Sequence, residues 1–147
     1  MSSDAPLHLS DSEILDLVSK RGRPPSAELL GLEFLEIDQQ NDRVTLQFEA
    51  RSDFCNPIGT VQGGFLTAML DDAMAISGVI RSGFAMHMPT LELKVSFLRP
   101  ALPGKIRAVG EVVKFGKTIA FFEGSLYDSE NRLIARASAT ARPTPRA

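Results

Sequence analysis

Hydrophobic and polar residues alternate along several stretches of this chain. In residues 43–50, Val44, Leu46 and Phe48 alternate with polar neighbours, a pattern that predicts a strand with one buried face. A polar turn at 39–42 joins this strand to another predicted over 34–37, so the two form a hairpin. Further strands are predicted over residues 91–97, 105–114, 118–127 and 133–141. The short turns between the last three make neighbouring strands antiparallel.

Three other stretches favour helices. Ser10 or Asp11 can cap a short helix that ends at residues 21–25, and a second short turn is expected at 26–30. A long helix is predicted over residues 62–80, with a broad apolar face that carries Leu66, Met69, Leu70, Ala73, Met74, Ile76 and Ile80. The economical way to bury that face is for the sheet to wrap around the helix, which makes the fold class α+β.

Composition limits the classes of protein to which the chain can belong. Its 147 residues and 44% hydrophobic content fit a single domain with a sizeable core, in which residues 1–30 form an N-terminal helical extension. A net charge of -2 from 16 basic and 18 acidic residues provides no basic stripe for nucleic acid. One cysteine, Cys55, excludes an internal disulfide, and the N-terminus shows no signal sequence or membrane span. We therefore expect a cytoplasmic protein without a nucleic acid or membrane partner.

Metal and thiol chemistry are not expected. The two histidines, His8 and His87, lie far from each other and from Cys55 in the sequence. This spacing provides neither a cluster of metal ligands nor a cysteine–histidine nucleophilic pair. We expect no metal and no cofactor.

The stretch from Asn56 to Asp72 is the candidate site. Loop-forming residues lead to Gly63 and Gly64, where a helix begins with free N–H groups that favour negative charge. Asp71 shares its helical stripe with small residues only, namely Gly64, Thr67, Ala75 and Gly78. Asp72 falls on the flank of the helix. Two alternatives stay open: both aspartates are simply solvated, or the glycines are only a flexible junction.

The spacing along this helix indicates a dimer. Gly63 and Asp71 are eight residues apart, which corresponds to roughly 12 Å of helix. One small reacting group cannot easily contact both. A homodimer in which oppositely directed copies of the helix share their sites would bring the two groups together. We expect such a homodimer, assembled further as a dimer of dimers.

The same residues resemble a known family. The order Asn56, then Gln62-Gly63-Gly64, then Asp71 is similar to the pattern of the PaaI-like acyl-CoA thioesterases, which have the hotdog fold. The resemblance covers roughly residues 30–142, including the strand from Thr90 and the turn at 115–118. The family usually has histidine where this chain has Gln62, so a side-chain amide replaces the imidazole.

The resemblance implies a role for each residue. It implies that the Gly63 N–H polarises the thioester carbonyl, that Asn56 helps to hold the carbonyl or water, and that Asp71 of the other subunit is the base or nucleophile. Thr90 would position the attacking water. Without the resemblance, Asn56 would be a turn former and Thr90 a residue at a strand edge.

The resemblance also implies a set of substrate contacts, with coenzyme A as part of the substrate. Lys114 and Lys117 would lie near the nucleotide end of coenzyme A, although lysines at turns usually only solvate the surface. The expected substrate-binding residues are Gln62, Gly64, Lys114, Gly116 and Lys117.

The expected activity is hydrolysis of acyl-CoA thioesters. Two alternatives remain. A non-catalytic acyl-CoA binding protein has Gln62 as its only indication. A hotdog hydratase or dehydratase would ordinarily need a catalytic histidine, and none lies near Asp71 in the sequence.

Overall fold

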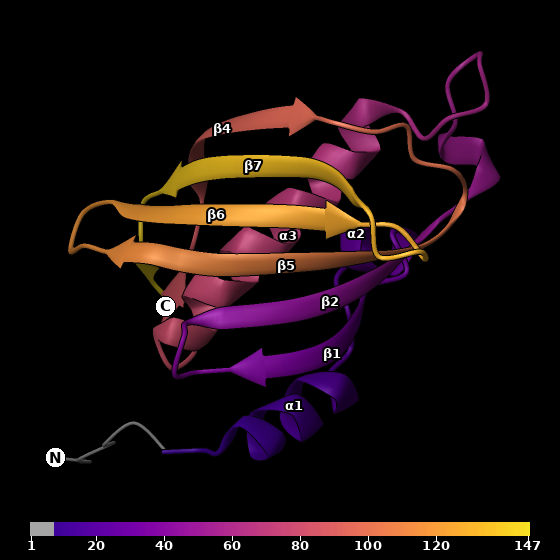
Figure 1. The fold of residues 1–147 in the computed structure, drawn as a ribbon. Coiled ribbons are helices and arrows are strands. Elements are labelled where there is room, and N and C mark those ends of the chain that lie inside the picture. Colours follow the sequence, from indigo (N-terminus) through magenta and orange to yellow (C-terminus); the bar gives the residue numbers. More distant parts are fainter. Residues whose placement is uncertain (1–7) are drawn as a thin grey trace, which may run out of the picture.

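A six-stranded antiparallel sheet curves around one side of a long helix in the computed structural model, which describes residues 8–147 (Figure 1). The strand order in the sheet is β1-β2-β5-β6-β7-β4. The strands are β1 (Glu33–Asp38), β2 (Arg43–Ala50), β4 (Thr90–Phe97), β5 (Gly104–Phe115), β6 (Ala120–Tyr127) and β7 (Leu133–Ala141). The α+β class and all six of these strands agree with the sequence predictions, with bounds that differ by at most two residues.

The long helix, α3 (Gly63–Arg81), packs its apolar side directly on the sheet. Its buried residues are Leu66, Met69, Leu70, Ala73, Met74, Ser77, Gly78 and Ile80. Gly110 of β5 makes the closest approach, because a Cβ there would lie 2.2 Å from the Ala73 carbonyl oxygen. The predicted apolar face is therefore correct except for Ile76, which is only half-buried.

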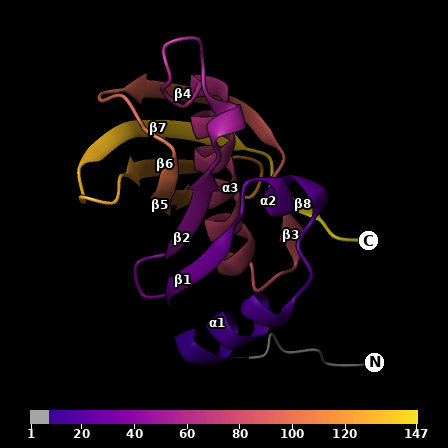
Figure 2. The ribbon, with the colours of Figure 1, turned by 90° about the vertical axis from the view of Figure 1, so that its right-hand side faces the viewer.

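The two short N-terminal helices, α1 (Asp11–Lys20) and α2 (Pro25–Leu29), follow the local signals in the sequence. Ser10 caps α1: its Oγ accepts from the Glu13 N–H at 3.2 Å, and the Glu13 carboxylate accepts from the Ser10 N–H at 2.7 Å. Ile14 and Val18 of α1 are buried. Figure 2 shows α1 below β1 and α2 on the side of α3 away from the sheet. Residues 1–7 of the predicted extension lie outside the described residues.

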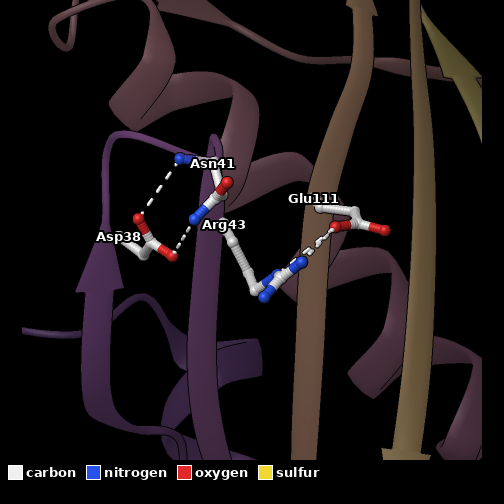
Figure 3. Close-up of polar contacts among 4 residues, drawn as sticks. All are labelled: Asp38, Asn41, Arg43 and Glu111. Atoms are coloured by element: carbon white, nitrogen blue, oxygen red, sulfur yellow. Dashed lines mark hydrogen bonds and ion pairs between the residues drawn. The ribbon is translucent and has the colours of Figure 1, made fainter.

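Polar contacts fix the hairpin of β1 and β2 (Figure 3). The Asp38 carboxylate accepts from the Asn41 backbone N–H at 3.2 Å and from its Nδ2 at 2.7 Å. The hydrogen bond from the Asn41 side chain lowers the pKa of Asp38. Arg43 of β2 forms an ion pair with Glu111 of β5 at 3.1 Å. The turn is thus held in shape, and the hairpin is tied to the neighbouring strand.

Two very short strands were not predicted from the sequence. β3 (Met86–His87) pairs with β8 (Thr144–Pro145) as a separate two-stranded sheet. The Arg146 N–H also donates to the Ala85 carbonyl at 3.0 Å. Two residues are too few to show alternation, which explains why they were missed. This pairing holds the C-terminal segment on the side of α3 away from the sheet (Figure 2).

By length and hydropathy alone, α3 would pass as a membrane span, and no other helix among residues 8–147 does. In this fold it is the helix on which the sheet packs.

Candidate active site

Asp71 and Thr90 lie in direct contact within one chain. The Thr90 hydroxyl, at the start of β4, donates a hydrogen bond of 2.6 Å to the Asp71 Oδ1 in the middle of α3. Asp71 is half-buried and Thr90 is exposed. A hydroxyl that donates its hydrogen still has lone pairs that accept from water. The pair can therefore hold a water molecule next to the carboxylate.

The first two N–H groups of α3 differ in their hydrogen bonding. The Gln62 side-chain oxygen accepts from the Gly64 N–H at 2.8 Å, and so it caps the helix. Gly63 is the first residue of α3, and its N–H has no acceptor among residues 8–147. Gln62, which stands where the family usually has histidine, thus accepts from the Gly64 N–H. The Gly63 N–H remains a free donor at the positive end of the helix.

Phe97, which sequence reasoning did not identify, borders this free donor. A Cβ built on Gly63 would lie 3.0 Å from the tip of the Phe97 ring, so the ring lies over this glycine. Phe97 ends β4 and is 52% exposed. Alternation along residues 91–97 predicted its strand, but nothing in the sequence linked it to Gly63. Any group that reaches the Gly63 N–H passes beside an aromatic surface.

Asn56 organises its own loop. Its Oδ1 accepts from the N–H groups of Ile58 (3.1 Å) and Thr60 (3.2 Å), and its Nδ2 donates to the Thr60 hydroxyl at 2.8 Å. These bonds fit the turn-former interpretation. One Nδ2 hydrogen has no acceptor in this set of bonds, and it is the part of Asn56 that can still meet a carbonyl or water.

Asp72 differs from its neighbour and is not simply solvated. Its side chain is half-buried, and its Oδ2 is buried without a hydrogen-bond partner among the described residues. Burial raises the pKa of Asp72 to about 6, with a smaller contribution from the charge of Asp71. The alternative that both aspartates are solvated is therefore wrong, because Asp72 faces a cavity that residues of α1, α2 and the C-terminal segment also line.

The small-residue stripe beside Asp71 is open only in part. Gly64 is exposed, whereas Thr67 and Ala75 are half-buried. Gly78 is buried, and a Cβ there would lie 2.8 Å from the Phe122 ring. At Gly78 the close approach is thus made by the core side chains of Phe122 and Met88.

The turn between β5 and β6 lies far from Gly63 within one chain. The predicted substrate-binding residues there are Lys114, near the end of β5, and Gly116 and Lys117 in the turn itself. The Phe115 ring lies 5.6 Å from the guanidinium of Arg81, the last residue of α3, whereas Gly63 is the first (Figure 1). At Gly116, a Cβ would lie 2.5 Å from the Ile119 carbonyl oxygen, so the turn itself needs glycine. Lys114 and Lys117 are exposed.

The site residues thus form three groups. Asp71 and Thr90 make one. Gln62, Gly63 and Gly64 make a second at the start of α3, and Asn56 lies in the loop that leads to it. The end of β5 and the turn after it, with the two lysines, make a third at the opposite end. Within residues 8–147, no three histidine, cysteine or acidic side chains are grouped so that they could hold a metal ion.

Comparison with known proteins identifies the family. The model of the thioesterase superfamily matches residues 58–135, which is more than half of the chain. The matched region contains Gly63, Asp71 and Thr90. The chain belongs to the thioesterase superfamily.

Individual relatives agree with this assignment. A phenylacetic acid degradation-related protein from Ralstonia eutropha JMP134 is 32% identical, with a TM-score of 0.81 over 89% of this chain and 97% of that one. The Escherichia coli PaaI protein of the phenylacetic acid degradation operon has the same fold at 17% identity, with a TM-score of 0.74 over 82% and 85% of the two chains. A candidate esterase from Saccharolobus solfataricus is 26% identical over 69% of this chain and 71% of its own length. The fold is the hotdog fold, and the predicted resemblance to PaaI-like thioesterases is confirmed.

Proposed function

We propose that this protein hydrolyses acyl-CoA thioesters to a free acid and coenzyme A. The observation that carries the proposal is the Thr90–Asp71 hydrogen bond, which orients a carboxylate and leaves hydroxyl lone pairs for water. A carboxylate in this place can accept a proton from water or attack the carbonyl directly. Membership of the thioesterase superfamily supports thioester hydrolysis in general.

The reaction needs a hydrogen-bond donor to the thioester carbonyl as well as a nucleophile. The free Gly63 N–H, at the positive end of α3, would stabilise the oxyanion that forms on the thioester carbonyl. Asp71 would either take a proton from the attacking water or attack the carbonyl carbon itself, and water would then hydrolyse the acyl-enzyme. In both routes a C–O bond forms, the C–S bond breaks, and coenzyme A leaves as the thiol once its sulfur is protonated.

A homodimer with shared sites completes this arrangement. Gly63 and Asp71 lie on one helix, roughly 12 Å apart, so one thioester meets both groups only if they come from different subunits. Among the described residues, β4 pairs on one side only, with β7, and it carries the exposed Leu91 and Phe97. An open edge with exposed apolar residues favours pairing with a second chain. A second copy, antiparallel to the first, would also bring the lysines of the β5–β6 turn toward the Gly63 end.

A panel of aliphatic and aromatic acyl-CoAs tests the proposal. We expect at least one to be hydrolysed, and we expect Asp71→Asn to lower kcat/KM by about 10³-fold or more, since an amide can neither attack nor accept the proton. Asp72→Asn should cause a much smaller loss. Asp16→Asn, on the exposed surface of α1, is the matched control and should behave as the wild type.

Binding without turnover would contradict the proposal. If acyl-CoAs bind but none is hydrolysed, the protein is a non-catalytic acyl-CoA binder. Equal losses in the two α3 variants would show that Asp71 is not the reacting group.

A further inference from the structure

Two buried polar side-chain atoms lack a hydrogen-bond partner among residues 8–147, and both belong to residues that line the same cavity. They are the Oδ2 of Asp72 and the Nε of Arg23. One is an acceptor and the other a donor, and neither side chain forms an ion pair with the other or with any described residue. Unpaired buried polar atoms are costly, so each is a place where a ligand group would be stabilised.

The cavity has a volume of about 430 Å³ and mostly apolar walls. Its lining comes from one flank of α3, from β1, from the α1–α2 connection and from the C-terminal segment. Figure 2 shows the α1–α2 connection and the C-terminal segment on the same side of α3. Its apolar lining includes Val18, Leu32, Phe34, Ile76, Val79 and Phe84. Its volume is that of a site for a small organic ligand. None of the residues placed in the active site lines it.

Charge at the cavity favours an anion. Arg21, Arg23 and Arg146 line it together with a single acid, Asp72. The Arg21 guanidinium lies 5.0 Å from the centre of the Phe84 ring, so this cation is held over an aromatic wall. Arg21 and Arg146 are exposed and Arg23 is half-buried. A carboxylate can therefore meet a guanidinium without being fully desolvated.

We propose that this cavity binds a small apolar carboxylic acid that carries a hydroxyl group. The apolar body would lie against Ile76, Val79 and Phe84, the carboxylate would accept from Arg23, and the hydroxyl would donate to the free Oδ2 of Asp72. The two groups of the ligand thus satisfy both unpaired atoms at once. The proposal concerns a second site and does not depend on the thioesterase activity.

Titration with a matched pair of probes tests this site. The probes are 3-(4-hydroxyphenyl)propanoate and 3-phenylpropanoate, which differ only in the hydroxyl, and binding is followed by the methyl NMR signals of the isoleucines. We expect the signals of Ile76 and Ile80, which line the cavity, to shift. Ile134, buried in β7, should not respond. The hydroxylated probe should bind about 10-fold more tightly, the value of one charge-assisted hydrogen bond.

Two variants assign the contacts. In Asp72→Ala the two probes should bind equally, because the partner of the hydroxyl is gone. Arg23→Gln should weaken both probes about 10-fold. Asp16→Asn and Lys20→Gln, an exposed pair on α1, are the matched controls and should leave both affinities unchanged. The unperturbed signal of Ile134 shows in each case that the fold is intact.

Three results would overturn the proposal. The first is no shift of Ile76 or Ile80 at the highest soluble probe concentration, which would mean that only water fills the cavity. The second is a hydroxyl advantage that persists in Asp72→Ala. The third is loss of binding in Asp71→Asn, which would place the probe in the active site instead.

Discussion

Two adjacent aspartates on α3 have opposite surroundings. Asp71 accepts a hydrogen bond from Thr90, whereas the Oδ2 of Asp72 is buried without a partner. Consecutive residues on a helix point about 100° apart, so one faces β4 and the other faces the segments that cover the flank. Identical side chains thus come to differ through the elements that pack against them.

The proton affinity of Asp72 makes stability depend on pH. In the folded protein the pKa of Asp72 is raised to about 6, against 3.8 when it is unperturbed. As the pH rises, the unfolded chain therefore loses this proton at a lower pH than the folded protein does. The free energy of unfolding falls as the pH rises from about 4 to 6 and stays reduced above that. We expect Asp72→Asn to gain about 1–3 kcal/mol of stability relative to the wild type at pH 7.5, and less at pH 4.5. Urea unfolding at the two pH values measures this, and an equal effect at both would refute it.

Thr90 should act on the rate more than on binding. We expect Thr90→Ala to lower kcat by about 10–100-fold with little change in KM, because the hydroxyl orients a carboxylate and a water that matter chiefly in the transition state. Thr90→Ser keeps the hydroxyl and should restore most of the rate. Steady-state kinetics on the best acyl-CoA measures both values, and a rise in KM alone would argue against the positioning role.

At the scale of elements, the distance between α3 and the sheet is set by glycines. Gly110 lets the backbone of α3 touch β5. At Gly124 of β6, an added Cβ would lie 3.0 Å from the Met74 side chain. Protein interiors tolerate no added volume where backbone meets backbone. The height of Asp71 above the sheet is fixed by these contacts.

A single added methyl group should therefore be costly at one glycine and harmless at another. We expect Gly110→Ala to destabilise the protein by about 3 kcal/mol, because the carbonyl of Ala73 cannot move without moving the helix. Gly22→Ala is the matched control: a Cβ there meets nothing within 4 Å. Denaturant midpoints compare the two variants, and equal midpoints would show that the helix can shift.

The elements themselves were largely predictable because their signals are local. Alternation defined residues 43–50 without error, and the capping signal at Ser10 placed the start of α1. The short turns predicted the β1–β2, β5–β6 and β6–β7 pairs correctly. The place of β4 was not predictable: β5 follows it directly in the sequence, yet β4 pairs with β7 at the edge of the sheet. No local pattern encodes the pairing of strands that a short turn does not join.

The candidate site shows the same difference between what local residues indicate and what long-range contacts decide. The resemblance indicated Asp71 and Thr90, which the structure brings together across 19 positions of sequence. The surroundings of Asp72 could not be predicted, because Arg23 and Arg146 reach its cavity from the two ends of the chain. Phe97 was missed for a similar reason, since its contact with Gly63 depends on where the end of β4 lies.

At the scale of the whole molecule, the proposed shared site predicts complementation. A mixed dimer of an Asn56→Ala subunit and an Asp71→Ala subunit has one site with both defects and one with neither. We expect each parent to be nearly inactive and the mixture to recover up to about a quarter of the wild-type activity, since random exchange puts half of the dimers in the mixed form and each has one intact site.

Mass spectrometry confirms that subunits have exchanged. The control mixes two differently tagged Asp71→Ala proteins, which should stay inactive after exchange. A mixture of the two parent variants that shows only their average activity would rule out sites shared between subunits.

The pairing of β4 with β7 also determines when, during synthesis of the chain, Thr90 can be held beside Asp71. Thr90 is opposite Ala141, the last residue of the last long strand. A growing chain on the ribosome exposes α3 and β4 well before β7, so the strand that carries Thr90 has no partner strand in its own chain until Leu133–Ala141 has emerged. The hydroxyl that holds Asp71 is thus among the last groups to be put in place. A chain terminated before residue 133 would carry every proposed catalytic residue and still lack the strand that positions Thr90.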